Sequence, residues 1–314
     1  MILRALSGLI CISLVLTVSG NTTSLPVCQH DHDLQNAADF LWAQYNPTLH
    51  LLAEAPQVEE TDYWLWNDNY LGYHTLRFYY PGIADSIMET LQSYGYMKNY
   101  AYEALFGQTV DLPFQSSINY TIEEGADYTI KLDIYNGSTM KDWKNYSNLL
   151  CLAALSQYWR GDITSAVSNF SKAVTMWDGA GILDEANNES TDREYNRYAV
   201  YKLALLLYTA KILDQPPSFH RDAEDIVWQM QNKTNYGIHT DYNSDLDPSG
   251  SNVNVETTAL VIGLYKWSYA LLNELTSKSP WVSCILIVTF VFILIISSYR
   301  QQLKMRFCYS AGKK

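Results

Sequence analysis

Apolar residues recur at helical spacing along most of the chain, and polar clusters separate the segments that carry this spacing. An apolar residue at every third or fourth position is typical of a helix that buries one face. Polar residues mark helix starts, so Asn67 or Asp68 is expected to cap one of these segments. The predicted helices cover residues 33–55 (a pair broken at Asn46-Pro47), 67–80, 84–94, 148–159, 163–177, 194–213, 220–231 and 255–275.

Short links join these segments, and helices joined by short links pack as antiparallel neighbours. One stretch, residues 109–136, breaks the helical pattern. Residues 120–122 and 128–135 alternate like strands, and Glu123-Glu124-Gly125 lies between them as a turn. We therefore expect a mainly α fold of antiparallel helical hairpins with a small inserted β-hairpin.

The two ends of the chain are apolar in a different way. Residues 1–20 have the basic, apolar and small-residue regions of a signal peptide. The segment 281–299 has no charge and is flanked by Trp281 and Tyr299, and as a helix it would span roughly 28 Å, which is close to the thickness of a bilayer core. The sequence predicts a single-pass type I membrane protein: signal peptide, extracellular or lumenal domain 21–279, transmembrane helix 281–299 and cytoplasmic tail 300–314.

Charge divides along the same boundaries. The chain has 33 acidic and 21 basic residues, a net charge of −12, yet neither end contains an acid. The basic residues at the ends are Arg4, Arg300, Lys304, Arg306, Lys313 and Lys314. A basic tail after the apolar segment predicts the cytoplasmic side of a membrane. We expect this membrane to be the plasma membrane, because the sequence shows no retention signal. The domain itself is strongly acidic, which argues against a nucleic-acid partner.

Cysteines and sequons fit a secreted domain. Of the 5 cysteines, Cys28 and Cys151 alone fall within residues 21–279, and an oxidising compartment favours a disulfide between them. Asn-x-Ser/Thr sequons predict surface glycosylation in a chain that enters the secretory pathway. These acceptors are Asn21, Asn119, Asn136, Asn145, Asn169, Asn188 and Asn232.

Two short motifs open helices in a way that resembles a known superfamily. They are Trp64-Leu-Trp-Asn-Asp-Asn69 and Asn254-Val-Glu-Thr-Thr-Ala-Leu260. Both resemble the starts of inner helices in six-hairpin glycosidases and related α/α toroids. The resemblance implies a toroid or partial toroid, in which the loops before the inner helices line a pocket, and an activity on carbohydrate.

Candidate site residues follow from the same motifs. Asp68 and Glu256 would form an acid–base pair for glycoside hydrolysis or a lyase reaction, and His239 and Asp241 would converge on the same pocket. Trp64, Trp66 and Tyr242 would stack on sugar rings, with Asn69 beside them. The alternative for Trp64 to Asn69 is a purely structural helix start, in which the polar residues satisfy free amides.

Oxygen-bearing residues alternate after His239. Asp241, Asn243 and Asp245 are spaced like the first half of a calcium loop, although Leu246 stands where such a loop has glycine. A polar loop that leads into the last helix is the alternative interpretation, and no dedicated metal motif is present.

Two classes of function remain open on the sequence alone. The first is a carbohydrate-active ectodomain of the glycosidase type. The second is a non-catalytic receptor or scaffold whose acidic, glycosylated surface binds a protein partner. The 25 tyrosines and 9 tryptophans suit sugar stacking, but they suit helix packing equally well.

Overall fold

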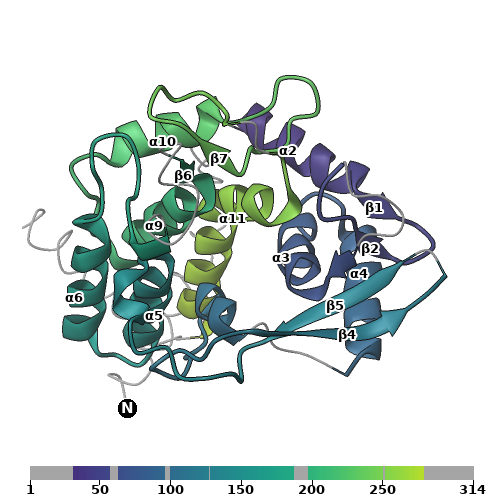
Figure 1. The fold of residues 1–314 in the computed structure, drawn as a ribbon, viewed down its shortest axis with the longest axis horizontal. Helices are drawn as coiled ribbons and strands as arrows, with labels where there is room; N and C mark the ends of the chain where they lie inside the picture. The colour runs from purple at the N-terminus through teal and green to yellow at the C-terminus, as the bar shows by residue number, and fades with distance from the viewer. Residues whose placement is uncertain are drawn as a thin grey trace, which may run out of the picture.

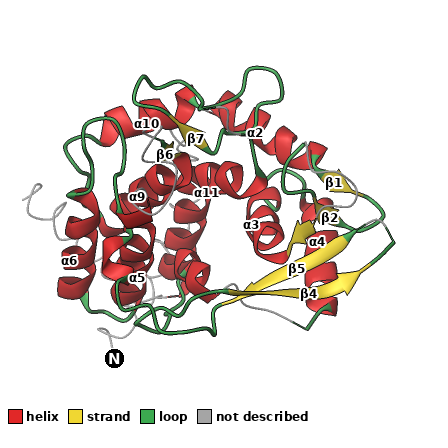
Figure 2. Cartoon of the chain, viewed as in Figure 1, coloured by secondary structure: helices red, strands yellow, loops and turns green. Residues whose placement is uncertain are grey.

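The computed structural model describes residues 31–56, 63–95, 100–126, 128–186, 197–249 and 252–278. Helices dominate, and the strands form small sheets (Figure 2). The helices are α2 (Asp31–Ala43), α3 (Trp66–Leu76), α4 (Pro81–Ser93), η1 (Tyr100–Phe106), η2 (Trp143–Asn145), α5 (Ser147–Trp159), α6 (Ile163–Val174), α9 (Val200–Leu213), α10 (His220–Gln229) and α11 (Val255–Lys278). The strands are β1 (Tyr45–Asn46), β2 (Leu51–Leu52), β3 (Tyr63–Leu65), β4 (Ile118–Glu124), β5 (Thr129–Ile134), β6 (Tyr198–Ala199) and β7 (Asp241–Tyr242). The mainly α prediction is confirmed.

The helices form an inner row with outer helices beside it. In the row, α5 packs against α9, α9 against α11, and α11 against α3. The outer helices α6, α10 and α4 each pack on the inner helix that precedes them, and α2 packs on α11 (Figure 1). The sequence explains this division: α9 is apolar on all sides and nearly all of its residues are buried, whereas α6 buries only Ala166, Phe170 and Ala173.

A three-stranded sheet lies beside α3, at the lower right of Figure 1. β4 and β5 form the predicted antiparallel hairpin, in which Ile118 pairs with Ile134. Residues Ile130, Leu132 and Ile134 of β5 are buried, as the alternating pattern requires. β3 pairs with β5 in parallel, Trp64 opposite Ile130, and this third strand was not predicted because it is only three residues long.

The second half of the first predicted helix pair is wrong. After α2 ends at Ala43, the chain forms a short antiparallel pair, with Tyr45 opposite Leu52 and Asn46 opposite Leu51. The Asn46 Oδ1 atom accepts hydrogen bonds from the backbone N–H groups of Thr48 (2.8 Å) and Leu49 (3.1 Å). Such an Asn turn competes with helix formation, so the Asn46-Pro47 break reverses the chain instead of starting a second helix.

Two predicted helix starts also differ. The residue before α3 is Leu65, so Asn67 and Asp68 lie inside the first turn and do not cap it. α9 begins at Val200 and not at 194, because residues 198–199 pair with β7; residues 187–196 lie outside the described ranges. The boundaries of α5, α6, α10 and α11 lie close to the predicted ones.

The predicted end segments, 1–20, 281–299 and 300–314, lie outside the described residues. Within the described ranges, no helix combines the length and the apolar character needed to cross a bilayer.

Candidate functional site

The first turns of α3 and α11 hold the two carboxyl groups that the sequence singled out. Asn67 fixes the start of α3 against β5, because its side-chain amide donates to the Asp133 carbonyl (3.3 Å) and accepts from the Asp133 N–H (2.9 Å). At α11, the Asn254 Oδ1 accepts from the Thr257 N–H at 2.9 Å, which is an N-cap. These local bonds place Asp68 and Glu256 at the same end of the inner row.

Asp68 is buried without a hydrogen-bond donor. Its residue is 6% exposed, and no hydrogen bond to its carboxyl occurs among the described residues. Burial raises the pKa of Asp68 well above its usual value, and the neighbouring charges of Glu256, Glu54 and Asp133 raise it further. Asp68 is therefore favoured in its protonated form.

Glu256 has one defined partner. The hydroxyl of Tyr102, from η1, donates a hydrogen bond to Glu256 Oε1. Burial raises the pKa of Glu256 and so does Asp133, but the Tyr102 hydrogen bond opposes this by stabilising the ionised carboxylate. The two carboxyls therefore have different surroundings: Asp68 lacks a donor, and Glu256 has one.

Three tyrosines surround the pair. Tyr102 comes from η1, Tyr135 follows β5, and Tyr201 lies in the first turn of α9. Burial raises the pKa of all three, and Glu256 is the next cause in each case. Apart from one another, the groups that raise the pKa of these three tyrosines electrostatically are carboxylates. The arrangement therefore supplies acidic groups and neutral hydroxyl donors.

The other two predicted catalytic residues, Asp241 and His239, have different surroundings. Asp241 lies in β7 and accepts a hydrogen bond from the Thr240 hydroxyl (3.0 Å), and its charge contributes to the raised pKa of Tyr201 after burial, Glu256 and Asp184. Asp241 thus lies near enough to Tyr201 for its charge to act on it, at the edge of the candidate site. The His239 Nε2 atom instead lies 3.2 Å from the Asn232 amide nitrogen, in the segment that follows α10. We leave His239 out of the candidate site.

The predicted sugar-binding residues lie largely in the interior. Trp66 is 1% exposed, stacks on Tyr70 at 5.4 Å and points its indole N–H at the Leu91 carbonyl (3.4 Å). Asn69 holds β2 through the Leu52 N–H (2.6 Å) and carbonyl (3.1 Å). A fully enclosed side chain has no free face for a sugar ring, so both residues are structural here.

Tyr242 and Trp64 are buried as well. Tyr242 is 0% exposed, stacks on Tyr198 at 5.3 Å and donates to the Ala180 carbonyl at 2.9 Å. Trp64 is 7% exposed, and its indole N–H has no partner within the described part of the chain. Of the four predicted binding residues, only Trp64 keeps an unsatisfied polar atom. Sequence reasoning missed the three tyrosines, since nothing in the sequence distinguishes them from the other 22.

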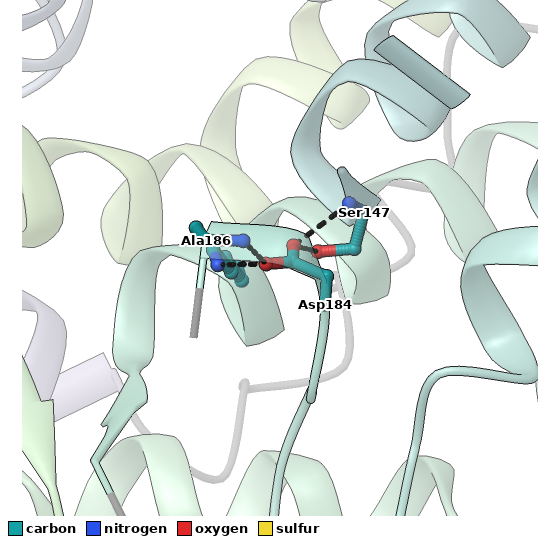
Figure 3. Close-up of polar contacts among 4 residues, drawn as sticks. Ser147, Asp184 and Ala186 are labelled. Carbon is teal, nitrogen blue, oxygen red and sulfur yellow. Dashed lines mark hydrogen bonds and ion pairs between the residues drawn. The ribbon is translucent and has the colours of Figure 1, made fainter. Parts of the chain in front are cut away.

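A second buried carboxyl lies at the start of α5 and is fully satisfied. Asp184 Oδ2 accepts from the N–H and the hydroxyl of Ser147, both at 2.9 Å, and Oδ1 accepts from the Ala186 N–H at 3.1 Å (Figure 3). Lys202 Nζ forms a buried ion pair with Asp184 Oδ1 at 2.7 Å. This network joins α5, α9 and the segment between α6 and α9, and it leaves no acceptor directed at a ligand.

Metal and disulfide predictions have separate outcomes. In the predicted calcium loop, the Asn243 side chain stabilises a turn: its Oδ1 atom accepts hydrogen bonds from the backbone N–H groups of Asp245 and Asp247, both at 3.0 Å. Within the described ranges, no three His, Cys, Asp or Glu side chains gather closely enough to hold a metal ion. Cys151 is buried and forms no disulfide with any described residue, and burial raises the pKa of its thiol to about 12. Its predicted partner, Cys28, lies outside the described residues, so the pairing stays a prediction.

The predicted glycosylation sites fall in varied positions. Asn119, Asn136 and Asn145 are exposed, whereas Asn169 and Asn232 are half-buried. Asn21 and Asn188 lie outside the described residues. Exposure suits the first three as acceptors, and glycosylation of any of the sequons remains a prediction.

No protein-family model, curated protein or solved structure matches the chain.

Proposed function

We propose that the chain is a glycoside hydrolase whose acid–base pair is Asp68 and Glu256. The observation that carries the proposal is this pair: two buried carboxyls from different helices, close enough for the charge of one to raise the pKa of the other. Burying a carboxyl without a cation is costly, and a fold retains such a group mainly where it serves a function.

The surroundings assign a role to each carboxyl. Asp68, protonated and without a donor, would protonate the departing glycosidic oxygen as general acid. Glu256, held by Tyr102, would act as the base that activates water or as the nucleophile. Environments that push the pKa values of two carboxyls apart are the usual basis of such a division of roles.

The arrangement of the helices supports a partial α/α toroid as the scaffold. Asp68, Tyr201 and Glu256 all lie in the first turns of inner helices, α3, α9 and α11. Helix N-termini carry partial positive charge, which stabilises the negative charge that develops on a carboxylate during the reaction. In the wider proposal, this domain is glycosylated and held outside the cell by a C-terminal membrane helix at 281–299.

The test is hydrolysis of aryl glycosides and polysaccharides by the full-length chain purified in detergent. Asp68→Asn and Glu256→Gln should each lower kcat/KM by about 10²- to 10⁴-fold, the usual contribution of an acid–base group. Asp225→Asn on α10 and Glu89→Gln on α4 are the matched controls, because both residues are exposed on outer helices. These controls should keep full activity.

Two outcomes would overturn the proposal. If the wild-type chain hydrolyses no glycoside, the alternative of a non-catalytic ectodomain that binds a protein partner takes its place. If hydrolysis occurs but survives both substitutions, the active site lies elsewhere in the domain.

A further inference from the structure

A cavity of about 350 Å³ lies against η1, the helix whose Tyr102 donates a hydrogen bond to Glu256. It is bounded by η1, by the segment 108–115 and by Tyr135 at the end of β5. Gln108, Thr109 and Gln115 on its wall are exposed, so the cavity opens to solvent. Its volume lies at the lower end of the range typical of small-molecule sites.

Tyr135 connects this cavity to the carboxyl pair. It lines the cavity, and it lies two residues after Asp133, whose backbone is hydrogen-bonded to Asn67, the neighbour of Asp68. Burial and then the charges of Glu256, Asp133 and Asp68 raise the pKa of Tyr135, which agrees with this position. The Tyr135 ring is 6.0 Å from that of Tyr100, which lines the cavity from η1. A ligand bound at the carboxyls and extended past Tyr135 would enter the cavity.

The wall has the chemistry of a sugar subsite. Tyr100 and Tyr135 contribute aromatic rings on which a sugar face can stack, and the buried Phe114 closes the wall behind them. Glu103 is 7% exposed and accepts a hydrogen bond from the Tyr70 hydroxyl, and a carboxylate can accept further bonds from sugar hydroxyls. Asp111 is exposed at the rim, 3.6 Å from the Arg160 guanidinium. The buried Glu103 carboxylate disfavours a uronic acid or another anionic sugar next to it, because like charges repel in a partly desolvated pocket.

We propose that the cavity is a second sugar subsite, so that the chain binds an uncharged or amino-sugar oligosaccharide across Tyr135. The proposal rests on the proposed function, since it takes Asp68 and Glu256 as the point of cleavage. It adds the substrate class: a chain of several linked sugars, with no acidic groups, as opposed to a single terminal residue.

Binding measurements separate this proposal from catalysis. Titration calorimetry on the full chain carrying Asp68→Asn would use neutral oligosaccharides of increasing length, glucosamine oligosaccharides and oligogalacturonates. Affinity for one of the two non-anionic series should rise by about tenfold at the length at which the oligosaccharide extends into the cavity. The oligogalacturonates should bind more weakly than that series.

A cavity-filling variant supplies the control. Thr109→Trp, added to Asp68→Asn, should abolish the gain with length and leave binding of the shortest ligand unchanged. Thr164→Trp, an exposed threonine on α6, is the matched substitution away from the cavity and should change neither. Affinity that is independent of length, or a gain that survives Thr109→Trp, would overturn the subsite. Loss of hydrolysis is read in the separate activity assay, so the two proposals can fail independently.

Discussion

Asp184 and Asp68 are both aspartates buried near the start of an inner helix, yet their surroundings are opposite. Asp184 is bonded by Ser147, Ala186 and the Lys202 ammonium. No residue in the described ranges donates a hydrogen bond to Asp68, and the charged groups that raise its pKa are carboxylates. A buried polar group that is fully bonded contributes to a specific structure, whereas one left without partners has a cost that the rest of the fold must offset.

Hydrogen-bond partners distinguish the two aspartates better than burial does. Both residues are 6% exposed, so solvent exposure does not distinguish them. Their partners do: Ser147, Ala186 and Lys202 bond to Asp184, whereas no described residue donates a hydrogen bond to Asp68. We therefore expect substitutions at the Asp184 site to change stability at all pH values, and substitutions of Asp68 to change activity and the pH dependence of stability.

The largest expected effect is on stability at Asp184. Lys202→Met would leave the Asp184 carboxylate buried without its cation, which should lower the free energy of unfolding by about 3–5 kcal/mol. Urea unfolding followed by circular dichroism would measure the change. The double variant Lys202→Met/Asp184→Asn should recover a large part of the loss, since it removes the uncompensated charge. A single variant as stable as wild type would contradict the structural role of the pair.

The next expected effect is the pH dependence of stability at Asp68. Its pKa is raised in the folded state, so the folded chain holds this proton at pH values where the unfolded chain has already released it. Stability is then highest below the unfolded pKa, near 4, and falls as pH rises through the window up to the folded pKa, by about 1.4 kcal/mol per pH unit.

Asp68→Asn removes this titration. Its unfolding free energy should fall less steeply than that of wild type as pH rises from about 4, and at neutral pH the variant should be at least as stable. Urea unfolding at a series of pH values tests the difference, with Asp225→Asn as the surface control. Identical slopes in wild type and Asp68→Asn would mean that Asp68 is not held protonated.

The sequence predicted the residues of one of these two sites but not those of the other. The motif around residues 64–69 and Glu256 pointed to Asp68 and Glu256, because both lie in the first turns of apolar helices. The sequence could not indicate that Asp184 is bonded to Lys202, since that contact depends on how the segment between α6 and α9 packs against α9. Trp66 and Tyr242 were expected to stack on sugar rings for a similar reason: residue type indicates stacking ability, but tertiary packing decides whether a ring face is open.

Secondary structure shows the same division. α6 was predicted because its apolar residues share one helical face, whereas α5 and α11 were predicted from long apolar stretches without helix breakers. The β1–β2 turn and β3 were missed because each depends on a few bonds, the Asn46 side-chain turn in one case and pairing with β5 in the other. Elements of two or three residues carry no periodicity that could reveal them.

The smallest expected effect concerns the donor to Glu256. Tyr102→Phe removes the hydrogen bond that stabilises the Glu256 carboxylate, so the pKa of Glu256 should rise. A hydrogen bond to a charged group is worth about 1.5–3 kcal/mol, which corresponds to roughly one to two pH units. The acidic limb of the kcat/KM profile on an aryl glycoside should move upward by about that amount.

Tyr201→Phe is the matched control for this shift. Tyr201 also lies near Glu256, but the Tyr102 hydrogen bond remains in that variant, so the acidic limb should stay in place. Equal shifts in both variants would indicate a general change of polarity in the pocket and would remove the specific role given to Tyr102.

The packing of α2 on α11 has a consequence for how the chain is made. The first described helix completes its contacts only against the last one, with the rest of the domain between them in sequence. During synthesis α2 emerges early and keeps its apolar face, including Leu34, Ala37 and Leu41, exposed until α11 has been added. Contacts this distant slow folding and leave the nascent chain open to aggregation, so the domain would depend on chaperones until its final helix is released.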